Sequence, residues 1–201
     1  MRKPIALVLG LLVYTVACQN ATPKEVGATD SAKGKPTTKK NDFFPVADYI
    51  RGQINLMDST PIGFAKYHTR MGKSDTSYAS TAAFDSVAKE FLPAELSDSV
   101  FEKNFQESSF MDQSTQSVTF TYATKDDGPG LKRVDVLAAQ NPDFDKIKSI
   151  YMEKTEMHQD TLVQKKMIWM AKQSIQVITI RQPANRPPTT EQVKLVWDKV
   201  D

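Results

Sequence analysis

The alternation of apolar and polar residues changes its period partway along the chain. Up to about residue 111, apolar side chains recur every three or four positions, and beyond that point they recur at every second position. The first pattern predicts helices and the second predicts strands. Because short connections join the strands, the sequence predicts an α+β domain with about three N-terminal helices packed on one face of an antiparallel meander of five to six strands.

Three segments carry the helical pattern. Ser97 is the expected N-cap of the third helix, whose buried face would carry Phe101 and Phe105. Between the first two helices, an imperfect alternation over 62–70 favours a short strand before a loop at 72–75. Apolar residues at helical spacing predict the first two helices, with Val46, Ile50, Ile54 and Met57 for 45–58 and Phe84, Val87, Ala88, Phe91 and Leu92 for 81–92.

The strand pattern is cleanest at 118–122. Turn residues at 127–130 and 141–143 separate this strand from its successors. Further strands are expected from residue 134 and at 147–156, 161–171, 174–181 and 191–199. Since helices cover one face of such a sheet, the other face must be solvated, paired with a partner or curled round a ligand.

One strand pair allows a register to be proposed. Folding the two strands on either side of Gln159 onto each other places Tyr151 opposite Met167 and Glu153 opposite Lys165. Opposite charges that face each other across a strand pair stabilise it, so this charge pair favours the register.

In this register Tyr151, Met167 and Trp169 share one sheet face. If the helices cover the other face, these residues form an exposed aromatic patch, which predicts a binding site for an apolar ligand or a partner protein. The alternative is that the patch is a second small core. A register error of one residue would exchange the two faces.

The first seventeen residues have the order of a secretory signal. Basic residues at 2–3 precede an apolar stretch over 5–16, which is too short to span a bilayer as a permanent helix. The sequence Thr-Val-Ala-Cys at 15–18 resembles the lipobox of bacterial lipoproteins. That resemblance implies removal of residues 1–17 and attachment of a diacylglyceryl group to Cys18, the only cysteine.

The motif departs from the commonest lipobox at Thr15, where that form has leucine, and the alternative is a plain cleaved signal with an incidental cysteine. The residues after Cys18 are Gln19 and Asn20, which resemble the pattern of lipoproteins passed on to the outer membrane. No acidic cluster follows Cys18 immediately, so an outer-membrane lipid anchor that faces the periplasm is expected in preference to surface display.

The remaining chain divides into a tether and one domain. Cys18 and the polar segment up to residue 41 form the expected lipidated, disordered tether, because 19–41 contains no aromatic residue, Leu, Ile or Met. A single α+β domain is expected over 42–201. Loss of Arg2 and Lys3 with the signal leaves 24 of the 26 basic residues against 24 acidic ones, so no electrostatic argument supports a nucleic-acid partner.

Candidate chemistry is sparse. His68 and His158 lie 90 residues apart, and no serine-hydrolase elbow, phosphate-binding glycine loop or His-Glu zinc motif is present in the sequence. An enzyme is therefore the minority interpretation, and neither a cofactor nor a metal is expected. The acidic residues around His158 are more simply explained as turn residues, namely Glu153, Glu156 and Asp160.

The leading hypothesis is a non-enzymatic, lipid-anchored envelope protein that binds an apolar ligand or a partner protein through its sheet. Two alternatives stay open. One is a periplasmic carrier that resembles the open half-barrels that shuttle lipids or lipoproteins. The other, less favoured, is a hydrolase of envelope polymers, which would need clustered carboxylates or a nucleophile.

Overall fold

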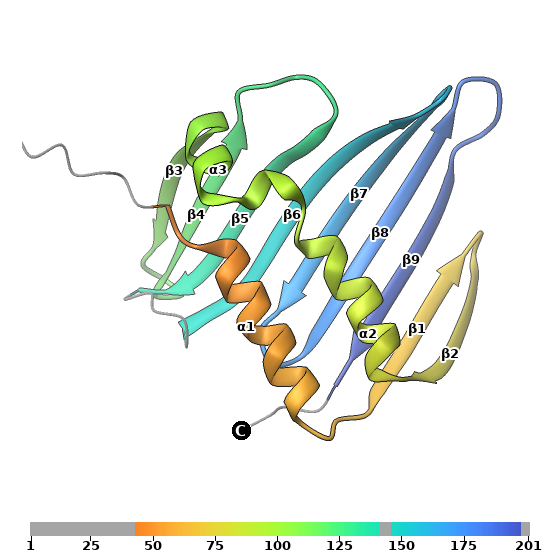
Figure 1. Cartoon of the computed structure of the whole chain (residues 1–201), viewed down its shortest axis with the longest axis horizontal. Helices are drawn as coiled ribbons and strands as arrows, with labels where there is room; N and C mark the ends of the chain where they lie inside the picture. The colour runs from red at the N-terminus through yellow and green to blue at the C-terminus, as the bar shows by residue number, and fades with distance from the viewer. Residues whose placement is uncertain (1–42, 141–145, 198–201) are drawn as a thin grey trace, which may run out of the picture. The chain divides into compact units, whose positions relative to one another are not determined.

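The computed structural model describes residues 43–140 and 146–197, which belong to one compact unit over Asn41–Asp201. The described residues form three α-helices, two short 3-10 helices and a nine-stranded antiparallel sheet, with the helices on one side of it (Figure 1). The predicted α+β class is confirmed. The prediction of five to six strands is wrong, because the sheet has nine.

In chain order the elements are α1 (Val46–Ser59), β1 (Phe64–Arg70), β2 (Lys73–Ala79), α2 (Thr81–Ala88), η1 (Lys89–Phe91), η2 (Ala94–Leu96), α3 (Asp98–Asn104), β3 (Phe105–Asp112), β4 (Ser117–Thr124), β5 (Gly130–Ala139), β6 (Ile147–His158), β7 (Thr161–Met170), β8 (Ser174–Pro183) and β9 (Thr189–Val196). The strand order across the sheet is β2-β1-β9-β8-β7-β6-β5-β4-β3. The sheet is therefore a meander from β3 to β9, to which the β1–β2 hairpin is added beside β9.

The strands that the sequence pattern missed lie at the two edges of the sheet. The loop predicted at 72–75 is wrong, because Met71 and Gly72 adopt positive φ values of 50° and 76° and make a tight turn into β2. Phe105 was expected in the third helix but begins β3. Edge strands with both faces in solvent carry no period-2 signal, and nearly all residues of β2 and β3 are exposed.

The other local predictions agree with the structure. The helix expected over 45–58 is α1, and the one over 81–92 is α2 continued by η1. Ser97 occupies the predicted N-cap position of α3, but its side chain makes no capping hydrogen bond, and only its backbone carbonyl accepts from the first turn. The strand favoured at 62–70 is β1. The break expected at 141–143 lies outside the described residues.

The core lies between the helices and the sheet and is rich in aromatic rings. Phe84 of α2 stacks on Phe64 of β1, with ring centroids 4.8 Å apart, and meets Trp197 edge-on at 5.7 Å. Trp169 of β7 packs edge-on against Phe84 at 6.1 Å and against Phe91 at 5.3 Å. Helix α2 is thus held on the sheet by rings that come from distant parts of the sequence.

The register predicted for β6 and β7 is wrong by one residue. Tyr151 lies opposite Ile168, not Met167, and Met167 lies opposite Met152. The hairpin turns through two residues, Gln159 and Asp160, whereas the prediction folded the strands about Gln159 alone. Because side chains alternate between faces, this slip places Met167 and Trp169 on the helix-covered face and leaves Tyr151 on the open one.

The energies of the two registers explain the outcome. The charge pair used for the prediction involves Glu153, whose side chain is 38% exposed, and ion pairs of exposed groups contribute about 0.2–1 kcal/mol. Truncation of a buried tryptophan costs about 3–5 kcal/mol. Burial of Trp169 therefore dominates, and Glu153 meets Lys166 instead, with 4.0 Å between Oε1 and Nζ.

Candidate functional site

The sheet face away from the helices is the candidate binding surface. We call it the open face. Every described helix lies on the other side of the sheet (Figure 1). Half-buried apolar side chains lie along the central strands of this face, among them Leu137, Tyr151, Leu162, Ile168, Ile178 and Ile180.

Polar residues separate these apolar side chains. Ile168 lies opposite Tyr151 on one neighbouring strand and opposite Gln176 on the other. Ile178 lies between Lys166 and Gln192 in the same way. The open face is consequently neither a continuous apolar patch nor a charged surface.

Tyr151 is the residue of the predicted site that does lie on this face. Its hydroxyl donates a hydrogen bond to Glu153. Burial, followed by the hydrogen bond and the charge of Glu153, raises the pKa of Tyr151 above its usual range. The phenol is therefore neutral at physiological pH and presents an apolar ring whose polar tip is already bonded.

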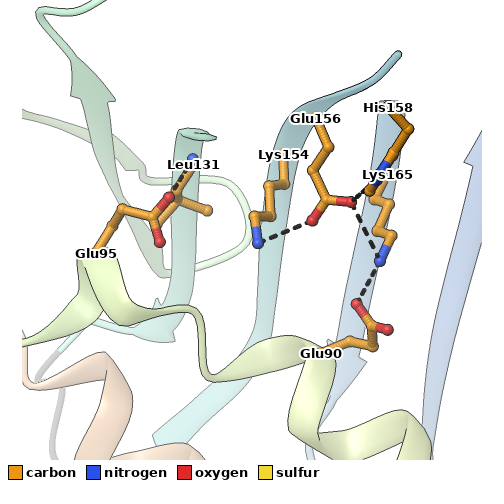
Figure 2. A network of polar contacts seen from close by, with 7 residues as sticks. All are labelled: Glu90, Glu95, Leu131, Lys154, Glu156, His158 and Lys165. Atoms are coloured by element: carbon orange, nitrogen blue, oxygen red, sulfur yellow. Dashed lines mark hydrogen bonds and ion pairs between the residues drawn. The ribbon is translucent and has the colours of Figure 1, made fainter. Parts of the chain in front are cut away.

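On the helix side, the connector over 89–96, which contains η1 and η2, crosses the sheet and is held by two glutamates (Figure 2). Glu90 pairs with Lys165 of β7 at 2.7 Å, and Glu95 accepts the backbone N–H of Leu131 of β5 at 3.1 Å. The two contacts fasten the connector to strands on either side of β6.

The lysines beneath this connector would repel each other without their acidic partners. Lys154 and Lys165 lie directly opposite on β6 and β7. Glu156 lies 3.0 Å from Lys154 and 3.8 Å from Lys165, and His158 Nε2 lies 3.0 Å from Glu156. The hydrogen bond from His158, followed by those charges, lowers the pKa of Glu156 to about 2, so the group is a carboxylate throughout the physiological range.

Contact between Glu95 and Leu131 occurs at an irregularity of the sheet. The register between β5 and β6 shifts between Leu131 and Arg133, so the ladder is interrupted there. Gly130, directly before it, has φ of 128°, and a Cβ atom at this position would lie 2.9 Å from Glu95 Oε1. Glycine is thus required both by the backbone conformation and by the approach of the carboxylate.

A second histidine and glutamate pair lies on the same side of the sheet. His68 Nε2 of β1 is 2.9 Å from Glu191 Oε1 of β9, and Arg181 of β8 binds the other carboxylate oxygen at 3.0 Å. The contact with His68, the largest cause, lowers the pKa of Glu191 together with Arg181. Each histidine is therefore bonded to a carboxylate that also binds a cation.

These ion pairs connect neighbouring elements of the fold, and their geometry does not mark them as catalytic groups. Glu156 and Glu191 each contact a histidine and a basic side chain, and these contacts lower the pKa of both carboxyl groups, so both are ionised and unsuited to donating a proton. The acids considered around His158 do not gather there, since Glu156 alone contacts its ring. Across 43–140 and 146–197 the structure holds no group of three or more His, Cys, Asp or Glu side chains placed to bind a metal.

The sequence-predicted site is divided between two faces. Tyr151 lies on the open face, while Met167 and Trp169 are fully buried under the helices and do not join it. Cys18 lies outside the described residues. Sequence reasoning missed Ile168 as an open-face residue. A two-residue turn at the β6–β7 hairpin would have placed Ile168 there, because tight hairpins commonly turn through two residues.

Comparison with models of known protein families finds no match, and comparison with curated proteins finds none either. Within the part of the chain that the structure describes, no helix is both long enough and apolar enough to cross a membrane. The function must therefore be inferred from the chain's own residues.

Proposed function

We propose that this protein is a lipid-anchored, non-enzymatic binding protein of the bacterial cell envelope, which holds a partner protein against the open face of its sheet. The observation that carries the proposal is the one-sided placement of the helices. It leaves half-buried Tyr151, Ile168 and Ile178 on a broad face with no described element over them.

The composition of the open face favours a protein over a small apolar ligand. Non-obligate protein interfaces mix apolar and polar area in about the proportion of an ordinary surface, with aromatic residues enriched at their centre. Tyr151 lies near such a centre, flanked by Ile168 and by the Arg133–Asp135 ion pair of β5. An apolar ligand is the alternative that a crosslinking experiment distinguishes.

The proposed anchor restricts where the partner is met. Lipidation of Cys18 would tie the domain to the outer membrane, on the periplasmic side, through the tether over 19–41. A flexible chain of this length has an average span of roughly 25 Å. The described domain begins at Phe43, whose ring packs against Tyr122 with centroids 4.9 Å apart. The partner would therefore lie in the envelope, within a few tens of Å of the membrane surface.

Site-specific photo-crosslinking in living cells tests this proposal. A photoreactive amino acid replaces Ile168 or Ile178 in the full chain, and a matched variant carries it at Ser86, an exposed residue of α2 on the helix side of the sheet. We expect one protein adduct of the same mass from both open-face positions and none from Ser86. A second change, Tyr151→Ser, should remove the adduct.

Two results of this experiment would contradict the proposal. If neither open-face position gives an adduct, or if Ser86 on the helix side gives the same one, the open face is not the partner site. Adducts of lipid mass at Ile168 and Ile178 would instead indicate an apolar ligand.

A carrier function is the second candidate. It is favoured by the nine-stranded sheet, which is wider than the sequence indicated, and by two buried indole N–H groups without a hydrogen-bond partner, those of Trp169 and Trp197. A lipid carbonyl could accept from them only if α2 moved away from the sheet. One equivalent of non-covalent lipid in the chain purified from envelopes would support this function, and its absence would contradict it.

A further inference from the structure

Strand β2 forms a free edge of the sheet. It pairs with β1 alone among the described strands, and its seven residues follow an uninterrupted register without a bulge or a proline. Such an edge presents unpaired backbone N–H and C=O groups to any strand that can lie beside it. Lysines on an edge strand discourage pairing with another chain, and β2 contains only one, Lys73 at its beginning.

This edge carries a protruding side chain, Tyr78, which we call the knob, and a hollow beside Ser74. Tyr78 is 95% exposed, the most exposed of the chain's large apolar side chains that are described. Ser74 lies four residues earlier on the same face and lines a hollow of about 350 Å³ together with Tyr67, Thr69 and Lys194. Ser74 is the hollow's lining residue on the edge strand on this face.

A two-fold axis through Thr76 brings the knob of one copy to the hollow of another. In an antiparallel pair of β2 strands centred on Thr76, Ser74 faces Tyr78 of the second copy and Asp75 faces Ser77. All seven residues are paired, and no two like charges face each other. Residues that face each other lie on the same side of a sheet, so each Tyr78 reaches the hollow beside Ser74.

Neighbouring registers are less favourable. An axis through Asp75 places two carboxylates directly opposite, which destabilises a strand pair. An axis through Ser77 leaves only five of the seven residues paired. The pairing centred on Thr76 therefore combines the longest overlap with the absence of charge repulsion.

We infer that β2 is a self-association surface, through which a second copy of this chain adds its own β2 to form a symmetric dimer. The interface is isologous, because the two-fold axis brings the same surface of each copy together. The two sheets become one continuous sheet with both open faces on the same side. This inference does not depend on the proposed partner, since β2 lies at the sheet edge and the proposed site lies on β6 to β8.

Single cysteines in the full chain test the axis. Thr76→Cys places a thiol opposite its own copy, within reach of a disulfide. Ser74→Cys places it about 13 Å from its copy, because the two lie four strand residues apart. Under mild oxidation in the membrane we expect a disulfide-linked dimer from Thr76→Cys and none from Ser74→Cys. A mixture of Ser74→Cys and Tyr78→Cys chains should give the heterologous pair.

Two controls separate the pairing from random collision. The parent chain, with Cys18 alone, measures the background, and Phe110→Cys measures an exposed position on the opposite edge strand. Adding Tyr78→Ser to Thr76→Cys should remove most of the dimer. Equal crosslinking at residues 74, 76 and 110, or none at 76, would overturn the inference, and neither result would affect the photo-crosslinking test of the open face.

Discussion

The Glu95 carboxylate accepts a hydrogen bond from the Leu131 backbone N–H, and the two residues lie 36 positions apart in the sequence. The contact fastens the connector to β5 at the place where the β5–β6 register shifts. Backbone groups at such an irregularity need another partner, and here a side chain from the helical layer supplies it.

Removal of this side chain should cost stability. In Glu95→Ala the Leu131 N–H loses its acceptor, and a half-buried donor without a partner costs about 1–2 kcal/mol of the free energy of unfolding. Urea denaturation of Glu95→Ala measures this cost, with Asp127→Ala in the exposed turn as the control. A loss no larger than that of Asp127→Ala would mean that water replaces the carboxylate.

Gly130 should tolerate no side chain. Gly130→Ala forces a Cβ to within 2.9 Å of Glu95 Oε1 at a φ of 128°, so we expect a loss of roughly 1–3 kcal/mol in the free energy of unfolding. Gly52→Ala is the matched control, because Gly52 lies within α1 with nothing within 4 Å of the added atom. That change should stabilise the protein by about 0.5–1 kcal/mol. Equal effects of the two changes would contradict the role assigned to Gly130.

The contacts of Glu156 with Lys154, Lys165 and His158 should make the free energy of unfolding depend on pH. The pKa of Glu156 is lowered in the folded protein to about 2, so the folded state holds fewer protons than the unfolded one between that value and the ordinary glutamate pKa. The stabilisation is present above about pH 5 and is lost as the pH falls toward 2. Because these ion pairs are partly exposed and screened, we expect it to be about 1 kcal/mol.

Glu156→Gln provides the measurement. Its free energy of unfolding should be lower than that of the parent at pH 7, and the difference should shrink below about pH 5 and become small at about pH 2. A difference that is the same at both pH values would show that the glutamine is harmful for steric reasons and that the charge is not responsible.

The two faces of the β6–β7 hairpin predict opposite consequences of aromatic truncation. Trp169→Ala removes a fully buried indole from the aromatic core and should cost about 3–5 kcal/mol of stability. Tyr151→Ser changes a half-buried ring on the open face and should cost markedly less while it reduces partner binding. Thermal unfolding of both variants measures the two losses of stability. Comparable losses would place Tyr151 in a core as well.

Local sequence patterns predicted much of the fold. The helices over 46–59 and 81–88 and the strands from β4 to β9 follow from a periodicity that is visible within about ten to fifteen residues, because one side of each element is buried and the other is not. The strands β2 and β3 could not be found in this way. Their side chains are exposed on both sides, so burial leaves no alternating pattern in them.

The candidate site depended on information that is not local. Whether Tyr151 or Trp169 meets the helices changes with a single residue of register, and the choice is made by the packing of Phe84 and Phe91 on the indole. Those rings lie about 80 residues from Trp169 in the sequence. A charge pair between neighbouring strands was therefore overruled by a contact that only the folded chain creates.

By itself, the sequence determined the class of the domain, the order of most of its helices and strands and the absence of a net charge on the chain after residue 17. The tertiary structure alone decided which sheet face is open, which strand is a free edge and which acids hold the connector. The physical reason is distance along the chain. Periodicity records whether a residue is buried, but the partner that buries it, such as Glu90 for Lys165 at 75 residues, is set by the packing of the whole domain.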